Sequence, residues 1–118
     1  MGALVTCRQL VELGECSMEL LKSRRKLKTI LLKAALAANA KIIEARSYAH
    51  AQGIGCVVII RESHILVTTF PAYGMAVIDI RTCGTKMKPG KAIERIAKEL
   101  HAKIQKIIQK AVTRLPAH

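Results

Sequence analysis

Three apolar runs rich in β-branched residues follow one another in the middle of the chain, and they constrain its fold more than any other feature. The runs span residues 56–60, 65–70 and 75–80. Runs of this length bounded by charged or turn residues are typical of strands. In the third run, Ala76 and Ile78 alternate with Asp79, as in a strand with one buried face. The middle of the chain therefore predicts consecutive strands of a mainly antiparallel sheet.

Helical periodicity lies on either side of these runs. Ser17 is a helix-capping residue with Glu19 in the first turn, and a helix that ends near Asn39 is expected to follow. Its apolar face consists of Leu27, Ile30, Leu31, Ala34, Ala35 and Ala38. A second helix opens at Lys88-Pro89-Gly90, and its apolar face consists of Ala92, Ile93, Ile96, Ala97 and Leu100. The spacing predicts two amphipathic helices, each with one face against the sheet.

Two further strands are expected at residues 3–13 and 41–48, with a turn at Gly53-Ile54-Gly55. The tail from Ala102 fits either a helix or a strand. We predict a single α+β domain over residues 1–118, a two-layer sandwich whose mainly antiparallel sheet carries two helices on one face.

The expected strand at residues 56–60 has apolar side chains on both of its faces, from Val57 to Ile60. Such a strand is covered on both sides. Since two helices cover only one face, a homodimer that buries the other face is expected.

The segment that begins at residue 62, after the first of the three apolar runs, carries a recognisable motif. It includes Glu62-Ser63-His64, Thr69, Pro71, Asp79 and Thr82-Cys83-Gly84. These residues resemble the self-cleavage segment of the prokaryotic S-adenosylmethionine decarboxylase proenzymes. The resemblance extends from about Leu4 to Thr113, and it favours a final strand for the tail.

This resemblance implies an enzyme that makes its cofactor from its own chain. Ser63 would be the nucleophile that cleaves the bond after Glu62 and becomes a pyruvoyl group, with His64 as a further processing residue. Cys83 would be the catalytic acid that reprotonates the substrate carbon after decarboxylation. A pyruvoyl carbonyl serves as an electron sink in the way that a pyridoxal Schiff base does.

Several positions depart from the family pattern. Thr68 replaces a histidine that removes a proton during processing, and Thr is no base near neutral pH. Gly55 replaces a serine that assists ester formation, and Ala72 replaces a glutamate. Phe70 stands in place of a tryptophan. The aromatic residue that stacks on the substrate's adenine corresponds to Ala49, whose neighbour is Tyr48. The resemblance thus assigns substrate binding to Phe70 and Tyr48.

Composition narrows the remaining function classes. The formal charge is +12. Such a charge attracts nucleic acid, yet only three of the 118 residues are Phe or Tyr, none is Trp, and stacking platforms are lacking. A solvated basic surface is favoured over a nucleic-acid interface. The charge offers nothing to a cationic substrate such as S-adenosylmethionine.

The cysteines indicate neither a metal site nor disulfides. Cys7, Cys16, Cys56 and Cys83 show no Cys-x-x-Cys spacing. The first three are expected to be small buried thiols. No apolar stretch is long enough for a membrane span and no secretory signal is present, so a cytoplasmic protein is expected.

Two function classes remain open. The first is a pyruvoyl-dependent decarboxylase of polyamine biosynthesis, self-processed at Glu62-Ser63 and acting on S-adenosylmethionine or on another amino acid such as arginine. The second is an uncleaved, non-catalytic relative that acts as a regulatory or binding partner, for example of a paralogous decarboxylase subunit.

Overall fold

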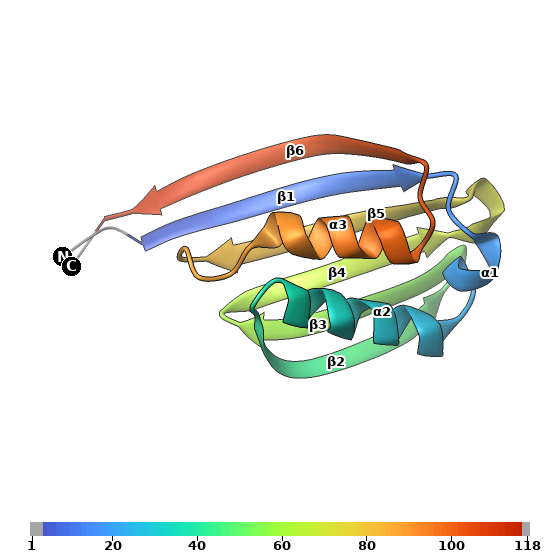
Figure 1. The fold of residues 1–118 in the computed structure, drawn as a ribbon, viewed down its shortest axis with the longest axis horizontal. Coiled ribbons are helices and arrows are strands. Elements are labelled where there is room, and N and C mark those ends of the chain that lie inside the picture. Colours follow the sequence, from blue (N-terminus) through green and yellow to red (C-terminus); the bar gives the residue numbers. More distant parts are fainter. Residues whose placement is uncertain (1–3, 117–118) are drawn as a thin grey trace.

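The chain pairs its strands into one antiparallel sheet of six. The computed structural model describes residues 4–116. The strands are β1 (Leu4–Gly14), β2 (Lys41–His50), β3 (Gly53–Arg61), β4 (Ser63–Phe70), β5 (Met75–Cys83) and β6 (Ile104–Leu115). Their order across the sheet is β2-β3-β4-β5-β1-β6. The helices α2 (Arg24–Ala37) and α3 (Pro89–Glu99) lie on one face of this sheet (Figure 1). The predicted α+β two-layer sandwich is confirmed.

Two serine caps divide the first helical region. Ser17 Oγ accepts a hydrogen bond from Leu20 N at 3.4 Å and begins the short helix α1 (Met18–Leu21). Ser23 Oγ accepts from Lys26 N at 3.2 Å and begins α2. The prediction of a single helix from Ser17 to Asn39 is therefore wrong in one respect, because the second cap restarts the helix.

The predicted turn at Gly53-Ile54-Gly55 is wrong. These residues belong to β3, and the two-residue turn before them is Ala51-Gln52. A Cβ at Gly53 would overlap the carbonyl oxygen of Thr69, and a Cβ at Gly55 would overlap the ring of Tyr48. Here glycine permits close approach within the sheet instead of marking a reversal of the chain.

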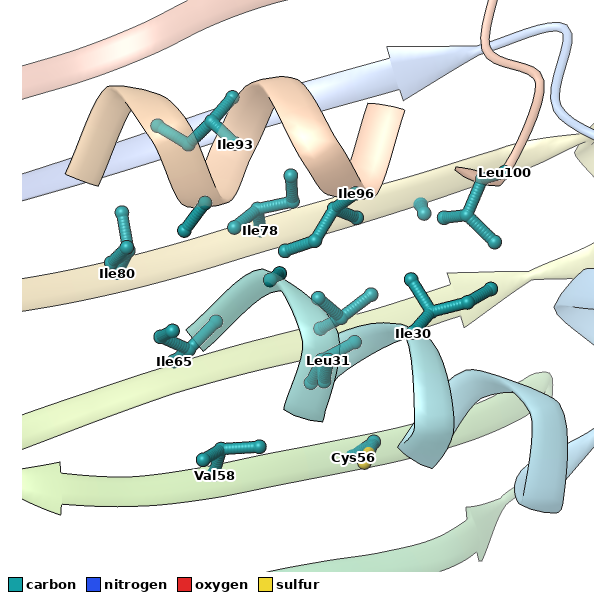
Figure 2. Packing of buried hydrophobic residues seen from close by; sticks show 14 of the residues in the cluster. Ile30, Leu31, Cys56, Val58, Ile65, Ile78, Ile80, Ile93, Ile96 and Leu100 are labelled. Carbon is teal, nitrogen blue, oxygen red and sulfur yellow. The ribbon is translucent and has the colours of Figure 1, made fainter. Parts of the chain in front are cut away.

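The hydrophobic core lies between the sheet and the helices. Alternate residues of the central strands face α2 and α3, as Figure 2 shows for Val58, Ile65, Ile78 and Ile80. The helices contribute the residues that their periodicity predicted: Leu27, Ile30, Leu31, Ala34, Ala35, Ala38, Ala92, Ile93, Ile96, Ala97 and Leu100. No helix among residues 4–116 has the length and apolarity to cross a bilayer.

The opposite sheet face, which we call the open face, carries no helix (Figure 1). Its apolar side chains Leu10, Val57, Leu66 and Val77 are half-buried, and Ile59 is exposed. The tail forms the strand β6, which pairs with β1 and is exposed along its whole length. The expectation of a strand for the tail is confirmed.

Because the core lies on one face of the sheet, two neighbouring residues of β5 should contribute differently to stability. Ile78→Ala removes a fully buried side chain and is expected to lower the free energy of unfolding by about 2–5 kcal/mol. Val77→Ala, on the open face, is expected to cost clearly less. Urea unfolding of both variants measures the difference, and equal losses would contradict the assignment of the core to one face.

Candidate active site

The motif Glu62-Ser63 lies at a tight connection between two paired strands. Ile60 of β3 pairs with Ser63 of β4, so only Arg61 and Glu62 form the turn. Glu62 is exposed, while Ser63 is half-buried at the first position of β4. The backbone bond predicted to break therefore joins an accessible turn to an ordered strand.

Cys83 lies at the end of β5 that is nearest to this turn. The residue is half-buried and pairs with Thr6 of β1. Gly84 follows with φ of 81°, a conformation that favours glycine, and its N–H donates to Val5 O at 2.8 Å. Glu62 and Cys83 both line one pocket of about 500 Å³. The predicted cleavage turn and the predicted catalytic acid are thus brought together.

His64 lies on the open face in a charged cluster. Its Nε2 is 3.8 Å from Oδ1 of Asp79. Arg8 donates two hydrogen bonds to the same carboxylate, from Nε at 3.2 Å and from an Nη at 2.9 Å. These bonds from Arg8 are the main reason why the pKa of Asp79 is lowered. Sequence reasoning assigned Asp79 only to the motif and missed Arg8, which no local pattern distinguishes from other basic residues.

The two predicted substrate-binding aromatics lie away from the cleavage turn. Tyr48 pairs with Gly55, and Phe70 pairs with Met75 at the far end of β4. Phe70 and His50 form an edge-on ring contact with centroids 5.7 Å apart. Ser63 and Phe70 stand at opposite ends of the same strand, seven residues apart and thus separated by roughly 23 Å. A single chain does not bring these aromatics together with Ser63.

The two altered helper positions are neighbours of each other. Thr68 of β4 pairs with Gly55 of β3, next to Tyr48 of β2. Thr68 is five residues along the strand from Ser63, a separation of about 16 Å. Gly55 and Thr68 therefore belong with the aromatic end of the open face, and neither can reach Ser63 of its own chain.

Comparison with known proteins identifies the family. The family model described as S-adenosylmethionine decarboxylase matches residues 8–114. The chain belongs to this family. The S-adenosylmethionine decarboxylase proenzyme of Thermodesulfovibrio yellowstonii is 40% identical over 101 residues, which cover 85% of this chain and 75% of the relative. The proenzyme of Sulfurisphaera tokodaii is 37% identical over 91 residues, which cover 77% of this chain and 75% of the relative.

A solved structure shows the same fold. The crystal structure of the adenosylmethionine decarboxylase of Aquifex aeolicus superposes with a TM-score of 0.79 and 24% identity. The alignment covers 100% of this chain and 95% of that one. The S-adenosylmethionine decarboxylase fold, which the motif led us to expect, is thereby confirmed.

The other cysteines of this decarboxylase-family chain differ from Cys83 in their surroundings. Cys16 and Cys56 are buried as predicted, whereas Cys7 is only half-buried. Burial raises the pKa of Cys56 to about 11, so its thiol stays protonated near neutral pH. Among residues 4–116, no group of three or more His, Cys, Asp or Glu side chains could hold a metal ion.

The charged cluster makes stability depend on pH. Because the pKa of Asp79 is lowered in the folded chain, its carboxylate stabilises the fold above the unfolded value of about 3.9, and this contribution is lost as the pH falls. Asp79→Asn is expected to lower the melting temperature near pH 7 and to reduce the further loss between about pH 5 and 3. Melting curves across this range test the point. An unchanged pH dependence in the variant would contradict it.

Proposed function

We propose that this chain is a proenzyme that cleaves itself between Glu62 and Ser63 and then decarboxylates S-adenosylmethionine, a reaction of polyamine biosynthesis. The observation that carries the proposal is the pocket shared by Glu62 and Cys83, which joins the cleavage turn to an acid for turnover. Family membership and the names of the relatives support the substrate.

The bonds that form and break in self-processing all lie at the β3–β4 turn, and the reaction also needs a base. Ser63 Oγ attacks the carbonyl carbon of Glu62, the peptide C–N bond breaks, and the released amine takes up the hydroxyl proton. The product is an ester. Loss of the Cα proton of residue 63 to a base then breaks the Cβ–Oγ bond, and the electron pair leaves with the carboxylate of Glu62. Water replaces the nitrogen of the resulting dehydroalanine as ammonia, which gives the pyruvoyl group.

The pocket beside the β3–β4 turn, which is lined by Glu62 and Cys83, fits this group and its use. The chemistry that a pyruvoyl group supplies at the start of β4 is an electron sink for a substrate amine. Cys83 lines the pocket and carries a thiol that can return a proton to the substrate carbon after carbon dioxide leaves. Residues 1–62 and 63–118 stay joined as one domain after cleavage, because β4 pairs with β3 and because β5 and β6 both pair with β1.

A homodimer would complete the site. The open face is apolar at Leu10, Val57, Leu66 and Val77, which favours burial against a second copy. If the two open faces pack with their strands running in opposite directions, the Tyr48–Phe70 end of one chain meets the Ser63 end of its partner. Substrate-binding aromatics and the helper positions would then act across the interface.

The altered helpers predict slow processing. Purified protein incubated for days is expected to remain mostly the intact chain, with a slow rise of two fragments, residues 1–62 and 63–118. Intact-mass measurement follows the reaction, and Ser63→Ala is expected to abolish it because no ester can form. Complete conversion during purification would show that Gly55 and Thr68 are adequate. Permanent absence of fragments would instead identify a non-catalytic relative.

A trans-complementation experiment tests two points together: whether restoring the helper residues at positions 55 and 68 speeds cleavage, and whether they act on Ser63 of the partner chain. One chain carries Ser63→Ala with Gly55→Ser and Thr68→His, so it cannot cleave itself. Mixed dimers of this chain with the wild-type chain are expected to accelerate cleavage of the wild-type partner. A hydrogen-bond donor contributes about 10²–10³ and a general base about 10²–10⁴ in rate.

The control replaces Gly55→Ser by Gly55→Ala in the helper chain. Any new Cβ at position 55 must displace the Tyr48 ring, so the alanine reproduces this steric effect without the hydroxyl. If only chains that carry both Ser63 and the restored residues were cleaved faster, the helpers would act within one chain. This result would contradict a site shared between two chains.

A further inference from the structure

Positive charge gathers in the pocket beside the cleavage turn. Three basic side chains line it together with Glu62, which is the one carboxylate that residues 4–116 contribute to the lining. They are Lys41 at the start of β2, Arg61 at the end of β3 and Lys86 in the loop after β5. Their elements are distant in sequence, so the fold itself creates this cluster, which we call the cation cluster.

The arrangement is electrostatically unfavourable in the intact chain. Lys41 and Arg61 are directly opposite in the β2–β3 register. Like charges at opposed positions destabilise a sheet. Within residues 4–116, the ion pairs formed by basic side chains involve Arg8, Lys26, Arg46, His64 and Arg95, and none involves the cation cluster. The cluster thus has more positive charge than the single exposed carboxylate of Glu62 balances.

We propose that the cation cluster receives the main-chain carboxylate that Glu62 gains on self-cleavage. This inference rests on the proposed self-processing. In the elimination step, the proton on Cα of residue 63 passes to a base and the Cβ–Oγ bond breaks, so one negative charge appears on the leaving carboxylate of Glu62. Cations that line the same pocket as Glu62 stabilise this charge as it develops. Lys41, Arg61 and Lys86 are therefore assigned to leaving-group stabilisation and to retention of the new chain end.

This role is separate from that of the altered helpers. Gly55 and Thr68 lie about 16 Å or more along the sheet from Ser63, whereas the cation cluster lines the same pocket as Glu62. The acyl shift passes through an oxyanion on the Glu62 carbonyl but yields a neutral ester, so the cluster changes the equilibrium between amide and ester little. The elimination of the carboxylate depends on the cluster. The two steps should respond differently when the charges are removed.

The experiment separates these steps with hydroxylamine, which cleaves the ester without elimination and leaves Ser63 unmodified at the new amino terminus. Lys41→Met and Lys86→Met remove charge with little change in length, singly and together. The double variant is expected to lose about tenfold or more in the rate of elimination, while the fraction of ester trapped by hydroxylamine stays equal or rises. High salt should slow elimination in the wild type but have less effect on the double variant.

Two matched variants control for other effects. Lys91→Met removes an exposed charge from α3 outside the pocket and is expected to change neither step. Lys86→Arg keeps the charge and is expected to retain most of the elimination rate. A parallel fall of ester and elimination in the double variant, or a failure of Lys86→Arg to retain the rate, would indicate a merely structural role and overturn the assignment.

The outcome also distinguishes this inference from the proposed function. A wild-type chain that is cleaved at the same rate as the double variant would refute the cation cluster alone. A wild-type chain that yields neither trapped ester nor fragments would refute self-processing, and the assignment of the cluster would fall with it.

Discussion

The antiparallel register of β3, β4 and β5 is the constraint on which the rest of the site depends. It leaves only Arg61 and Glu62 to connect β3 to β4, and it brings the end of β5 to the same end of the sheet. Burial against the helices holds this register, since a slip by one residue would turn Ile65 and Val67 out of the core. The bond that we propose to break is therefore positioned by the hydrophobic core, not by a loop of its own.

The same sheet divides the site into two groups. Helices on one face stabilise the register, and the other face is left with half-buried apolar residues around the Arg8–Asp79 pair. Along this face, the cleavage turn and Cys83 occupy one end, while Tyr48 and Phe70 lie toward the other. A reaction that needs both groups needs two chains. In the proposed homodimer, the open face would hold the two chains together and would also bring the two groups into one site.

The sequence predicted the elements that periodic patterns reveal. It missed the features that depend on how residues distant in sequence pack together. Apolar runs and helical spacing identified β1 to β5 and the buried faces of both helices, whereas only the family resemblance favoured the strand β6. The glycines of β3 were misread as a turn, because the partners that need the space, Tyr48 and Thr69, are distant in sequence. Thr69 is buried, accepts from Ile54 N at 3.0 Å and donates to Leu21 O at 2.8 Å, so its place in the motif has a structural reason. The cation cluster, drawn from three separate elements, leaves no local pattern.

The glycine that replaces the family's serine at position 55 is coupled to Tyr48. The Tyr48 ring occupies the space where a side chain on Gly55 would lie, so a processing serine and this tyrosine compete for one volume. Thr68 pairs with Gly55, so the two positions that depart from the family pattern are neighbours in the sheet. Because Tyr48 is half-exposed, its ring can turn toward a ligand, and that movement would open the space above Gly55. The substrate contact proposed for Tyr48 and the aid to ester formation proposed for a serine at position 55 would therefore compete for the same region. In the proposed mechanism, processing therefore depends on Tyr48 and Gly55 as well as on Thr68.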